Sequence, residues 1–266
     1  MMKILLTGAN GFVGNRIKNT YEKDVIASPS LRNVSEDDVK RIVEESGADV
    51  IVHTAAISDI GVCQNNPEQS YIANVMLPVY LAKAAQGRKL VCFSSDQVYS
   101  GCQTDGPYTE EEVGPANIYA EHKLEMEKRV LDIDPDAVML RAEWMYDVVS
   151  TRGNYIKNVL DGYLTFSSKQ YRGVTYLREV AENIPKVIAL PGGAYNFGSE
   201  TDSSMFEITR DLLTYLGRQG VVKDAPPRHN LWMNCGKASR YGVTFSNVLD
   251  GLKRCVDDYR LRRCTD

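Results

Sequence analysis

The sequence predicts an α/β protein in which a doubly wound parallel sheet is followed by a smaller C-terminal lobe. Through the first half of the 266 residues, short apolar runs alternate with segments of helical spacing. The apolar runs are nearly continuous, as expected for strands that helices cover on both faces. After residue 145 the alternation loosens and turn residues gather, which indicates a second, less regular lobe.

Five apolar runs are expected to form the strands of the sheet: 3–8, 24–28, 49–56, 89–95 and 137–143. Helical spacing between these runs predicts four helices, at 12–21, 35–46, 66–86 and 116–132. The second helix has a clear start and end, because Ser35 is followed three residues later by Asp38, and Gly47 follows its last residue. Strands that alternate with helices in this way form a parallel sheet.

The second half of the chain is expected to hold three helices and one strand. The helices are predicted at 178–190, 203–216 and 246–261, and the strand at 193–198. On this basis residues 1–145 form a first domain, to which residues 171–198 return. Residues 146–266 form mainly the second lobe.

Composition narrows the classes of function. The net charge is −4 and no block of lysine and arginine occurs, which argues against a nucleic-acid partner. No apolar run approaches the roughly 20 residues of a membrane span. The first strand begins near Lys3, so we expect no cleavable signal peptide. Six cysteines without metal spacing and three histidines predict reduced thiols, no metal site and a cytoplasmic location.

The segment "TGANGFVG" (7–14) places three glycines between the first predicted strand and the first predicted helix. Gly8 permits a tight turn, Gly11 lets a pyrophosphate approach the backbone, and Gly14 lets the helix pack closely on the strand. The amides at the start of the helix supply donors for phosphate. A Rossmann-type dinucleotide site is therefore predicted, with these residues in contact with the cofactor: Gly8, Asn10, Gly11, Phe12, Val13 and Gly14.

The choice of dinucleotide depends on residues near the second strand. The position about twenty residues after the first glycine often contacts the adenine ribose, and here it is Ser28 rather than a carboxylate. Arg32 lies close by, and a guanidinium pairs well with a 2′-phosphate. The sequence therefore favours NADP(H), while NAD(H) stays open.

The segment "YAEHK" (119–123) places a tyrosine and a lysine four residues apart, on one face of a predicted helix. The helix follows a strand that ends at Ser95, so the serine and the tyrosine can reach the same cleft. Reduction of a ketone needs a proton donor at the oxygen, and an adjacent ammonium favours the phenolate form of a tyrosine. We therefore predict that Tyr119 protonates the oxygen and Ser95 orients it. Lys123 would tune the tyrosine and hold the nicotinamide ribose.

These motifs resemble the extended short-chain dehydrogenase/reductases, in the branch that contains dTDP-4-dehydrorhamnose reductase. The resemblance covers nearly the whole chain and is carried by "KILLTGANGFVG", "DVIVHTAA", "FSSDQVYSG", "GPYTEEEVGPANIYAEHKLEMEK" and "LRAEWMY". It implies an oxidoreductase that reduces the keto group of a nucleotide-linked sugar. It also implies that Ser95 is the catalytic serine, and that four further residues lie beside the cofactor: Thr54, Ala55, Ala56 and Asn74.

The identity of the substrate is less determined than the chemistry. Asp96, Gln97 and Trp144 are the candidate substrate contacts, although Asp96 could equally cap a turn and Trp144 could pack inside the lobe. Gln97 stands where the resembled branch usually has a tyrosine, and Glu143 where it has a small or hydroxyl residue. Two alternatives stay open: an epimerase or dehydratase, and a non-catalytic regulatory subunit that binds dinucleotide. A homodimer is the candidate assembly.

Four other polar residues are expected to have no part in the chemistry. His53 ends a strand and is interpreted as a packed, hydrogen-bonded histidine, whereas His122 is expected to face solvent. Arg172 and Arg228 lie in loops of the second lobe, where a surface charge is favoured over binding of a nucleotide diphosphate.

Overall fold

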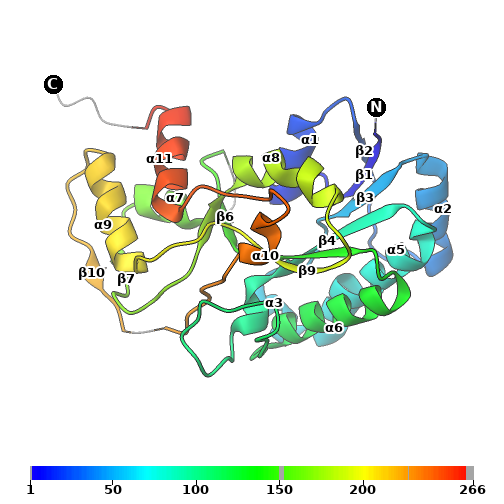
Figure 1. Cartoon of the computed structure of the whole chain (residues 1–266), viewed down its shortest axis with the longest axis horizontal. Coiled ribbons are helices and arrows are strands. Elements are labelled where there is room, and N and C mark those ends of the chain that lie inside the picture. The colour runs from blue at the N-terminus through cyan, green and yellow to red at the C-terminus, as the bar shows by residue number, and fades with distance from the viewer. Residues whose placement is uncertain (1, 150–152, 227, 262–266) are drawn as a thin grey trace.

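A computed structural model describes residues 2–149, 153–226 and 228–261 (Figure 1). Its centre is a six-stranded sheet in which every pair of neighbours is parallel. In spatial order the strands are β2 (Val25–Ala27), β1 (Ile4–Thr7), β3 (Val50–His53), β4 (Lys89–Ser95), β5 (Val138–Ala142) and β9 (Gly193–Phe197). The predicted doubly wound α/β fold is confirmed.

The strand order reverses between β1 and β3. After β1 the chain turns to β2 on one side, and it then crosses to β3 on the other side. The register pairs Thr7, the last residue of β1, with His53, the last residue of β3. Ligands of such sheets bind in the crevice outside the carboxyl ends of the strands at this switch point. The fold therefore places the predicted glycine turn at the expected binding crevice.

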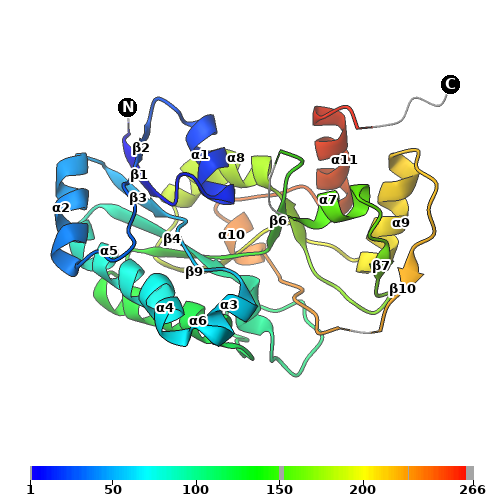
Figure 2. The same ribbon diagram turned by 180° about the vertical axis from the view of Figure 1, so that it is seen from behind.

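Helices cover both faces of the sheet (Figures 1 and 2). Side chains of one strand alternate between two cores, since Ile4 and Leu6 lie in the first and Leu5 in the second. The first core is closed by α1 (Phe12–Thr20) and α8 (Leu177–Ile188). The second is closed by α2 (Glu36–Ser46), α5 (Leu77–Ala85) and α6 (Ile118–Ile133). This two-sided burial explains why the strands read as continuous apolar runs.

In two of the predicted helices, local chemistry determines where the helix begins or is interrupted. The cap expected at Ser35 forms in full, because its side chain accepts from the Asp38 N–H while the Asp38 carboxylate accepts from the Ser35 N–H. The stretch 66–86 is not one regular helix. It consists of α4 (Pro67–Tyr71), a π turn (Ile72–Met76) and α5, and it is preceded by α3 (Ile60–Asn65). Pro78 lacks the N–H that would bond the carbonyl four residues earlier, which favours the break.

The second lobe has its own apolar core. Three helices contribute to it, α7 (Tyr155–Leu160), α9 (Met205–Tyr215) and α11 (Val248–Asp258). Two small parallel sheets complete the lobe, one of β6 (Trp144–Tyr146) with β8 (Val174–Tyr176) and one of β7 (Thr165–Phe166) with β10 (Lys223–Asp224). The sequence did not predict α7 or these strands, because two or three residues are too few to show a hydrophobic period.

Part of the later chain lies with the large sheet rather than with this lobe. Strand β9 pairs with β5, and α8 packs beside α1. The short helix α10 (Gly236–Ser239) packs against β9, with Ala238 and Val243 in the first core. Within the part of the chain that the structure describes, no helix is both long and apolar enough to span a membrane.

Candidate active site

The glycine turn after β1 is packed so closely that two of its glycines admit no side chain. Gly8 has a φ of +72°, and a Cβ there would lie 2.7 Å from the amide nitrogen of Ala55. A Cβ on Gly14 would lie 2.2 Å from the carbonyl oxygen of Gly8. The Gly11 N–H closes the turn by donating to the same carbonyl at 2.8 Å. The turn therefore holds the start of α1 directly against the end of β1.

The start of α1 fits the diphosphate of a dinucleotide. Gly11 is the residue that precedes the helix, and no side chain caps this end. The first amides of an α-helix have no acceptor within the helix, and the helix dipole makes this end attractive to anions. Asn10 and Gly11 are exposed, whereas Phe12 and Val13 are half-buried and pack against the first core. These residues would hold the cofactor through backbone donors.

The end of β2 lies next to this turn. The Ser28 N–H donates to the Leu6 carbonyl at 2.9 Å, which keeps Ser28 beside β1. The chain then turns sharply, and Asn33 adopts a left-handed conformation with a φ of +58°. Arg32 is exposed and forms no ion pair with any of the described residues. Its guanidinium is therefore available to a phosphate near the end of β2.

The loop after β3 packs against the glycine turn. The Thr54 hydroxyl donates to the Thr7 carbonyl at 2.7 Å, and Ala55 is packed against Gly8. Ala56, the next residue, is exposed. Asn74 is fully buried, and its side chain both donates to and accepts from the backbone of Ile57, at 2.9 and 3.1 Å. The amide of Asn74 thus orders the loop that carries the predicted cofactor contacts.

The predicted tyrosine and lysine lie on α6 beside β4. The side chain of Asn117 accepts from the Ala120 N–H at 2.9 Å, so the helix begins just before Tyr119. The Lys123 Nζ is buried and donates to the Phe93 carbonyl of β4 at 2.7 Å. It lies 5.8 Å from the centre of the Tyr119 ring. The lysine therefore links the helix to the strand and places its positive charge beside the tyrosine.

Burial controls the charges around Lys123. It lowers the pKa of the lysine to about 8, against the opposing influence of Cys92 and Glu127. Burial, together with the charge of Lys123, lowers the pKa of His53 to about 3. The Nδ1 atom of His53 is hydrogen-bonded to the Thr7 hydroxyl at 2.7 Å. His53 is therefore a neutral, packed histidine, as expected, and Lys123 keeps most of its charge at neutral pH.

Ser95 occupies the carboxyl end of β4, where a short 3-10 turn (Asp96–Tyr99) begins. Its hydroxyl donates to the carboxylate of Asp96 at 3.1 Å and accepts from the Gln97 N–H at 3.2 Å. The serine is buried. The two residues that follow the serine thus orient its hydroxyl.

The second lobe reaches Ser95 through Arg172. The Arg172 Nη2 pairs with the Asp96 carboxylate at 2.7 Å, and its guanidinium lies over the Trp144 ring, 5.4 Å from the ring centre. Only 15% of the Arg172 side chain is exposed. The expectation of a surface charge at this position was wrong. The loop-to-strand contact spans 76 residues, so no local pattern in the sequence could reveal it.

Glu143 is a buried carboxyl beside this pair, and the sequence assigned it no role. One of its oxygens accepts from the Thr175 hydroxyl at 2.7 Å and from the Ser199 N–H at 3.0 Å. Burial raises the pKa of the carboxyl to about 8. Glycines leave the space that the side chain fills, because a Cβ on Gly173 or Gly198 would lie 2.0 or 2.2 Å from its carboxylate. Glu143 is therefore largely protonated at neutral pH.

His122 was expected to face solvent, and this was also wrong. It is half-buried, its Nδ1 is hydrogen-bonded to the Ser70 hydroxyl at 2.8 Å, and its ring meets Tyr71 edge to face. Arg228, by contrast, is exposed. Among the residues described, no group of three or more histidine, cysteine or acidic side chains could hold a metal.

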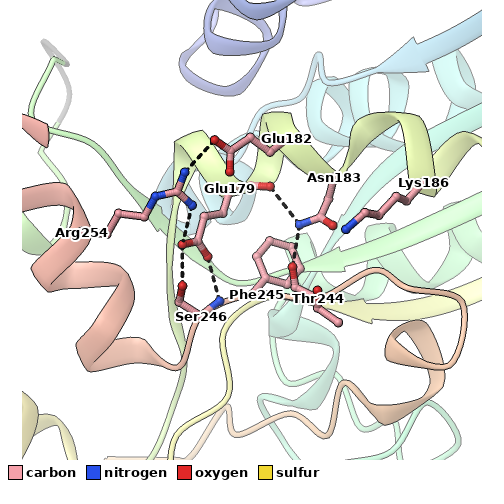
Figure 3. A pocket seen from close by; sticks show the side chains of 8 residues that line it. All are labelled: Glu179, Glu182, Asn183, Lys186, Thr244, Phe245, Ser246 and Arg254. Carbon is pink, nitrogen blue, oxygen red and sulfur yellow. Dashed lines mark hydrogen bonds and ion pairs between the residues drawn. The ribbon is translucent and has the colours of Figure 1, made fainter.

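A hollow of about 330 Å³ lies away from these residues, beside α8 and the start of α11 (Figure 3). Glu179 fills its wall, where it accepts from the Ser246 N–H at 2.9 Å and pairs with Arg254 at 3.1 Å. On the same wall, the side-chain amide of Asn183 donates a hydrogen bond to the Thr244 carbonyl at 2.9 Å. None of the predicted site residues lines this hollow. Its polar groups join α8 to the C-terminal segment.

Comparison with known proteins connects this site to a family. Residues 2–228 match the model of the RmlD substrate binding domain. The chain is 29% identical over 200 residues to a dTDP-4-dehydrorhamnose reductase of Mycolicibacterium smegmatis. It is 31% identical over 201 residues to methionine adenosyltransferase 2 subunit beta of Bos taurus. These matches cover 70% and 67% of this chain but only 60% of each relative's length.

A solved structure has the same fold along nearly the whole chain. It is a dTDP-4-dehydrorhamnose reductase of Bacillus anthracis in complex with NADP. The superposition has a TM-score of 0.84 and covers 97% of this chain and 99% of that one, at 22% identity. At this identity the likeness establishes the arrangement of helices and strands.

Proposed function

Because this chain belongs to the RmlD substrate-binding domain family, we propose that it is an NADP(H)-dependent reductase of a nucleotide-linked keto sugar. The observation that carries this proposal is the arrangement at the edge of β4. A buried serine ends the strand, and the next helix bonds the same strand through a buried, charged lysine that lies beside a tyrosine. Reduction of a ketone needs these parts, namely a proton donor, a group that holds the oxygen, and a cation that activates the donor.

Three side chains each have one task in this reaction. Tyr119 gives its proton to the developing alkoxide, and the ammonium of Lys123 stabilises the phenolate that the transfer leaves behind. With substrate bound, the Ser95 hydroxyl exchanges its hydrogen bond to Asp96 for one to the keto oxygen, which positions the carbonyl and stabilises charge on its oxygen. The glycine turn and the loop after β3 hold the cofactor, and bound NADPH supplies the hydride.

The cofactor assignment rests on the residues at the edge of the crevice. No carboxylate stands at Ser28 to contact a ribose hydroxyl, and the exposed guanidinium of Arg32 can pair with a 2′-phosphate. The related reductase of Bacillus anthracis was solved in complex with NADP. Both observations support NADP(H) over NAD(H).

The test is a spectrophotometric assay with a set of nucleotide-linked keto sugars, dTDP-4-dehydrorhamnose among them. We expect oxidation of NADPH in step with substrate. Tyr119→Phe should lower kcat by roughly 10²- to 10⁴-fold, the usual contribution of a proton donor. The variant should still bind NADPH, as measured by fluorescence titration. Turnover equal to that of the wild type in Tyr119→Phe would refute the mechanism.

A second candidate is a dinucleotide-binding subunit of another enzyme. The observation in its favour is the 31% identity to methionine adenosyltransferase 2 subunit beta, which is named as a subunit. NADPH binding without turnover of any keto sugar, together with co-purification of an enzyme, would support it. An epimerase or dehydratase would instead convert its sugar without net oxidation of NADPH. A cytoplasmic location and a homodimer stay predictions from the sequence.

A further inference from the structure

A buried ion pair lies one helical turn beyond the candidate catalytic lysine. Tyr119, Lys123 and Glu127 are spaced four residues apart along α6, so they share one face of the helix. The Glu127 carboxylate is paired with Arg141 of β5, whose Nε lies 3.1 Å from both of its oxygens and whose Nη2 lies 2.7 Å from one. Only 4% of the glutamate side chain and 5% of the arginine side chain are exposed.

The lysine and the glutamate are bonded to consecutive residues of β4. The Lys123 Nζ donates to the Phe93 carbonyl at 2.7 Å, and the Glu127 carboxylate accepts from the Ser94 hydroxyl. Arg141 belongs to β5, where it lies in register with Ser94. The negative end of the ion pair therefore comes from the helix that carries the lysine, and the positive end comes from the strand beyond β4.

Glu127 is the source of negative charge near Lys123 at neutral pH. The titratable groups that face the lysine come from four elements besides β5, and they are Tyr119 and Glu127 of α6, His53 of β3, Cys92 of β4 and Cys63 of α3. Burial raises the pKa of Cys92 to about 12 and lowers the pKa of His53 to about 3, so both are neutral. The Cys63 thiol keeps its proton, which it donates to a backbone carbonyl at 3.3 Å. Tyr119 enters the proposed reaction as a neutral phenol, which leaves Glu127 as the anion of this described group.

Arg141 allows the buried carboxylate to stay ionised. An unpaired buried carboxylate is costly enough that it takes up a proton instead, whereas a guanidinium that meets both of its oxygens offsets this cost. The Arg141 Nη1 also donates to the Tyr99 hydroxyl at 2.9 Å and to the Glu110 carbonyl at 2.6 Å. The position of the arginine therefore does not depend on Glu127 alone.

We propose that Glu127 is a positioning residue for the reaction, whose buried carboxylate keeps the ammonium of Lys123 charged beside Tyr119. The inference rests on the proposed reductase function. A charged lysine stabilises the phenolate that proton transfer leaves on Tyr119, and a neutral amine does not. Burial lowers the pKa of Lys123 to about 8, while Cys92 and Glu127 oppose this change. Because Cys92 is a neutral thiol at this pH, loss of the glutamate charge lowers the pKa of Lys123 further, and less of the lysine is charged near neutral pH.

The experiment compares four variants of the full chain with the wild type. Glu127→Gln removes the carboxylate charge and keeps an oxygen that can accept from Ser94. Glu127→Gln/Arg141→Met removes both charges, so it leaves no unpaired guanidinium inside the protein if the single variant folds poorly. Arg141→Lys disturbs the same pair but keeps both charges. Glu121→Gln is the matched control, because Glu121 is exposed on the same helix.

The first measurement needs no substrate. Lysines are labelled with ¹³C at Cε, the signal of Lys123 is identified as the one absent from Lys123→Met, and its titration is followed by NMR from pH 5 to 10. We expect a pKa of about 8 in the wild type. In Glu127→Gln and in the double variant the pKa should be lower by about one pH unit, the scale for loss of a neighbouring charge. In Arg141→Lys and Glu121→Gln the pKa of Lys123 should match that of the wild type.

The second measurement is kcat from pH 6 to 9, with the keto sugar that the wild type reduces. Near pH 6 the lysine is charged in every variant, so kcat of Glu127→Gln should be close to that of the wild type. At pH 7.5 it should be about threefold lower, because the charged fraction of the lysine falls from roughly three quarters to one quarter. A purely structural defect would lower kcat equally at both pH values, so the pH profile separates the two causes.

Three results would overturn the inference while leaving the reductase function in place. The first is an unchanged titration of Lys123 in both Glu127→Gln and the double variant. The second is an equal change in Arg141→Lys, which keeps the charge of the glutamate. The third is a loss of kcat that has the same size at pH 6 and at pH 7.5. A wild type without turnover on any keto sugar would instead refute the reductase function, and the NMR titration would still show whether Glu127 sets the charge of Lys123.

Discussion

Replacement of Glu143 by glutamine should remove a pH-dependent loss of stability. The carboxyl is 5% exposed, and burial raises its pKa from 4.5 to about 8. Glutamine has the same shape as the protonated acid, and its carbonyl oxygen can accept from Thr175 and Ser199 as the carboxyl does. The substitution thus keeps the packing and removes only the ionisation.

The sign follows from proton binding in the two states. Between pH 4.5 and about 8 the folded protein keeps a proton on Glu143 that the unfolded chain has released. The free energy of unfolding therefore falls as pH rises through this interval. The free energy of unfolding falls by about 1.4 kcal/mol for each pH unit, so the loss reaches roughly 5 kcal/mol near pH 8. Below pH 4.5 both states are protonated and the cost disappears.

Urea denaturation of the wild type and of Glu143→Gln at pH 5, 6.5 and 8 measures this pH dependence of the free energy of unfolding. The variant should gain stability over the wild type as pH rises, by several kcal/mol between pH 5 and pH 8. Glu22→Gln is the control, because Glu22 is exposed after α1 and should leave the pH dependence unchanged. Parallel curves for wild type and Glu143→Gln would show that Glu143 is not held protonated by its burial.

Two further predictions concern the cofactor crevice. Gly14→Ala should lower the free energy of unfolding by roughly 1–3 kcal/mol or more, because its Cβ would lie 2.2 Å from the Gly8 carbonyl oxygen. Gly11→Ala should lower it less, because its Cβ would lie 3.1 Å from the same oxygen. Equal urea midpoints for the two variants would contradict this prediction. Arg32→Ala should weaken NADPH binding about tenfold, near 1.4 kcal/mol, and leave NADH binding unchanged. An equal loss for both dinucleotides would exclude a role in binding the 2′-phosphate.

The sequence predicted those parts of the fold whose signals are local. Strands β1, β3, β4 and β5 lie within the predicted runs, because burial on both faces leaves an unbroken apolar stretch. The cap at Ser35 and the glycine turn depend on residues three apart, so spacing alone was sufficient. The second lobe was predicted only in outline. Its strands have two or three residues, and their pairing depends on partners far along the chain.

In the candidate site, too, the sequence predicted the residues whose signals are local and missed the others. Tyr119 and Lys123 are one helical turn apart, and the strand before them ends in Ser95, so the sequence shows the group directly. Arg172 and Glu143 could not be found by this route. Arg172 meets Asp96 across 76 residues, and Glu143 meets Thr175 across 32. The pKa of Glu143 follows from its burial, which only the fold creates.

Two departures from the resembled branch lie close together in the site. The glycine turn and the residues Ser95, Tyr119 and Lys123 follow the expected pattern, and in the proposed reaction they would hold the cofactor and the reacting oxygen. Gln97 and Glu143 depart from it, and both lie beside the Asp96–Arg172 pair. A chain that had lost its chemistry would be free to change its proton donor and its lysine. Changes beside the candidate substrate contacts are instead the expected result when the reaction is kept and the sugar differs, so the substrate screen should extend beyond dTDP-4-dehydrorhamnose.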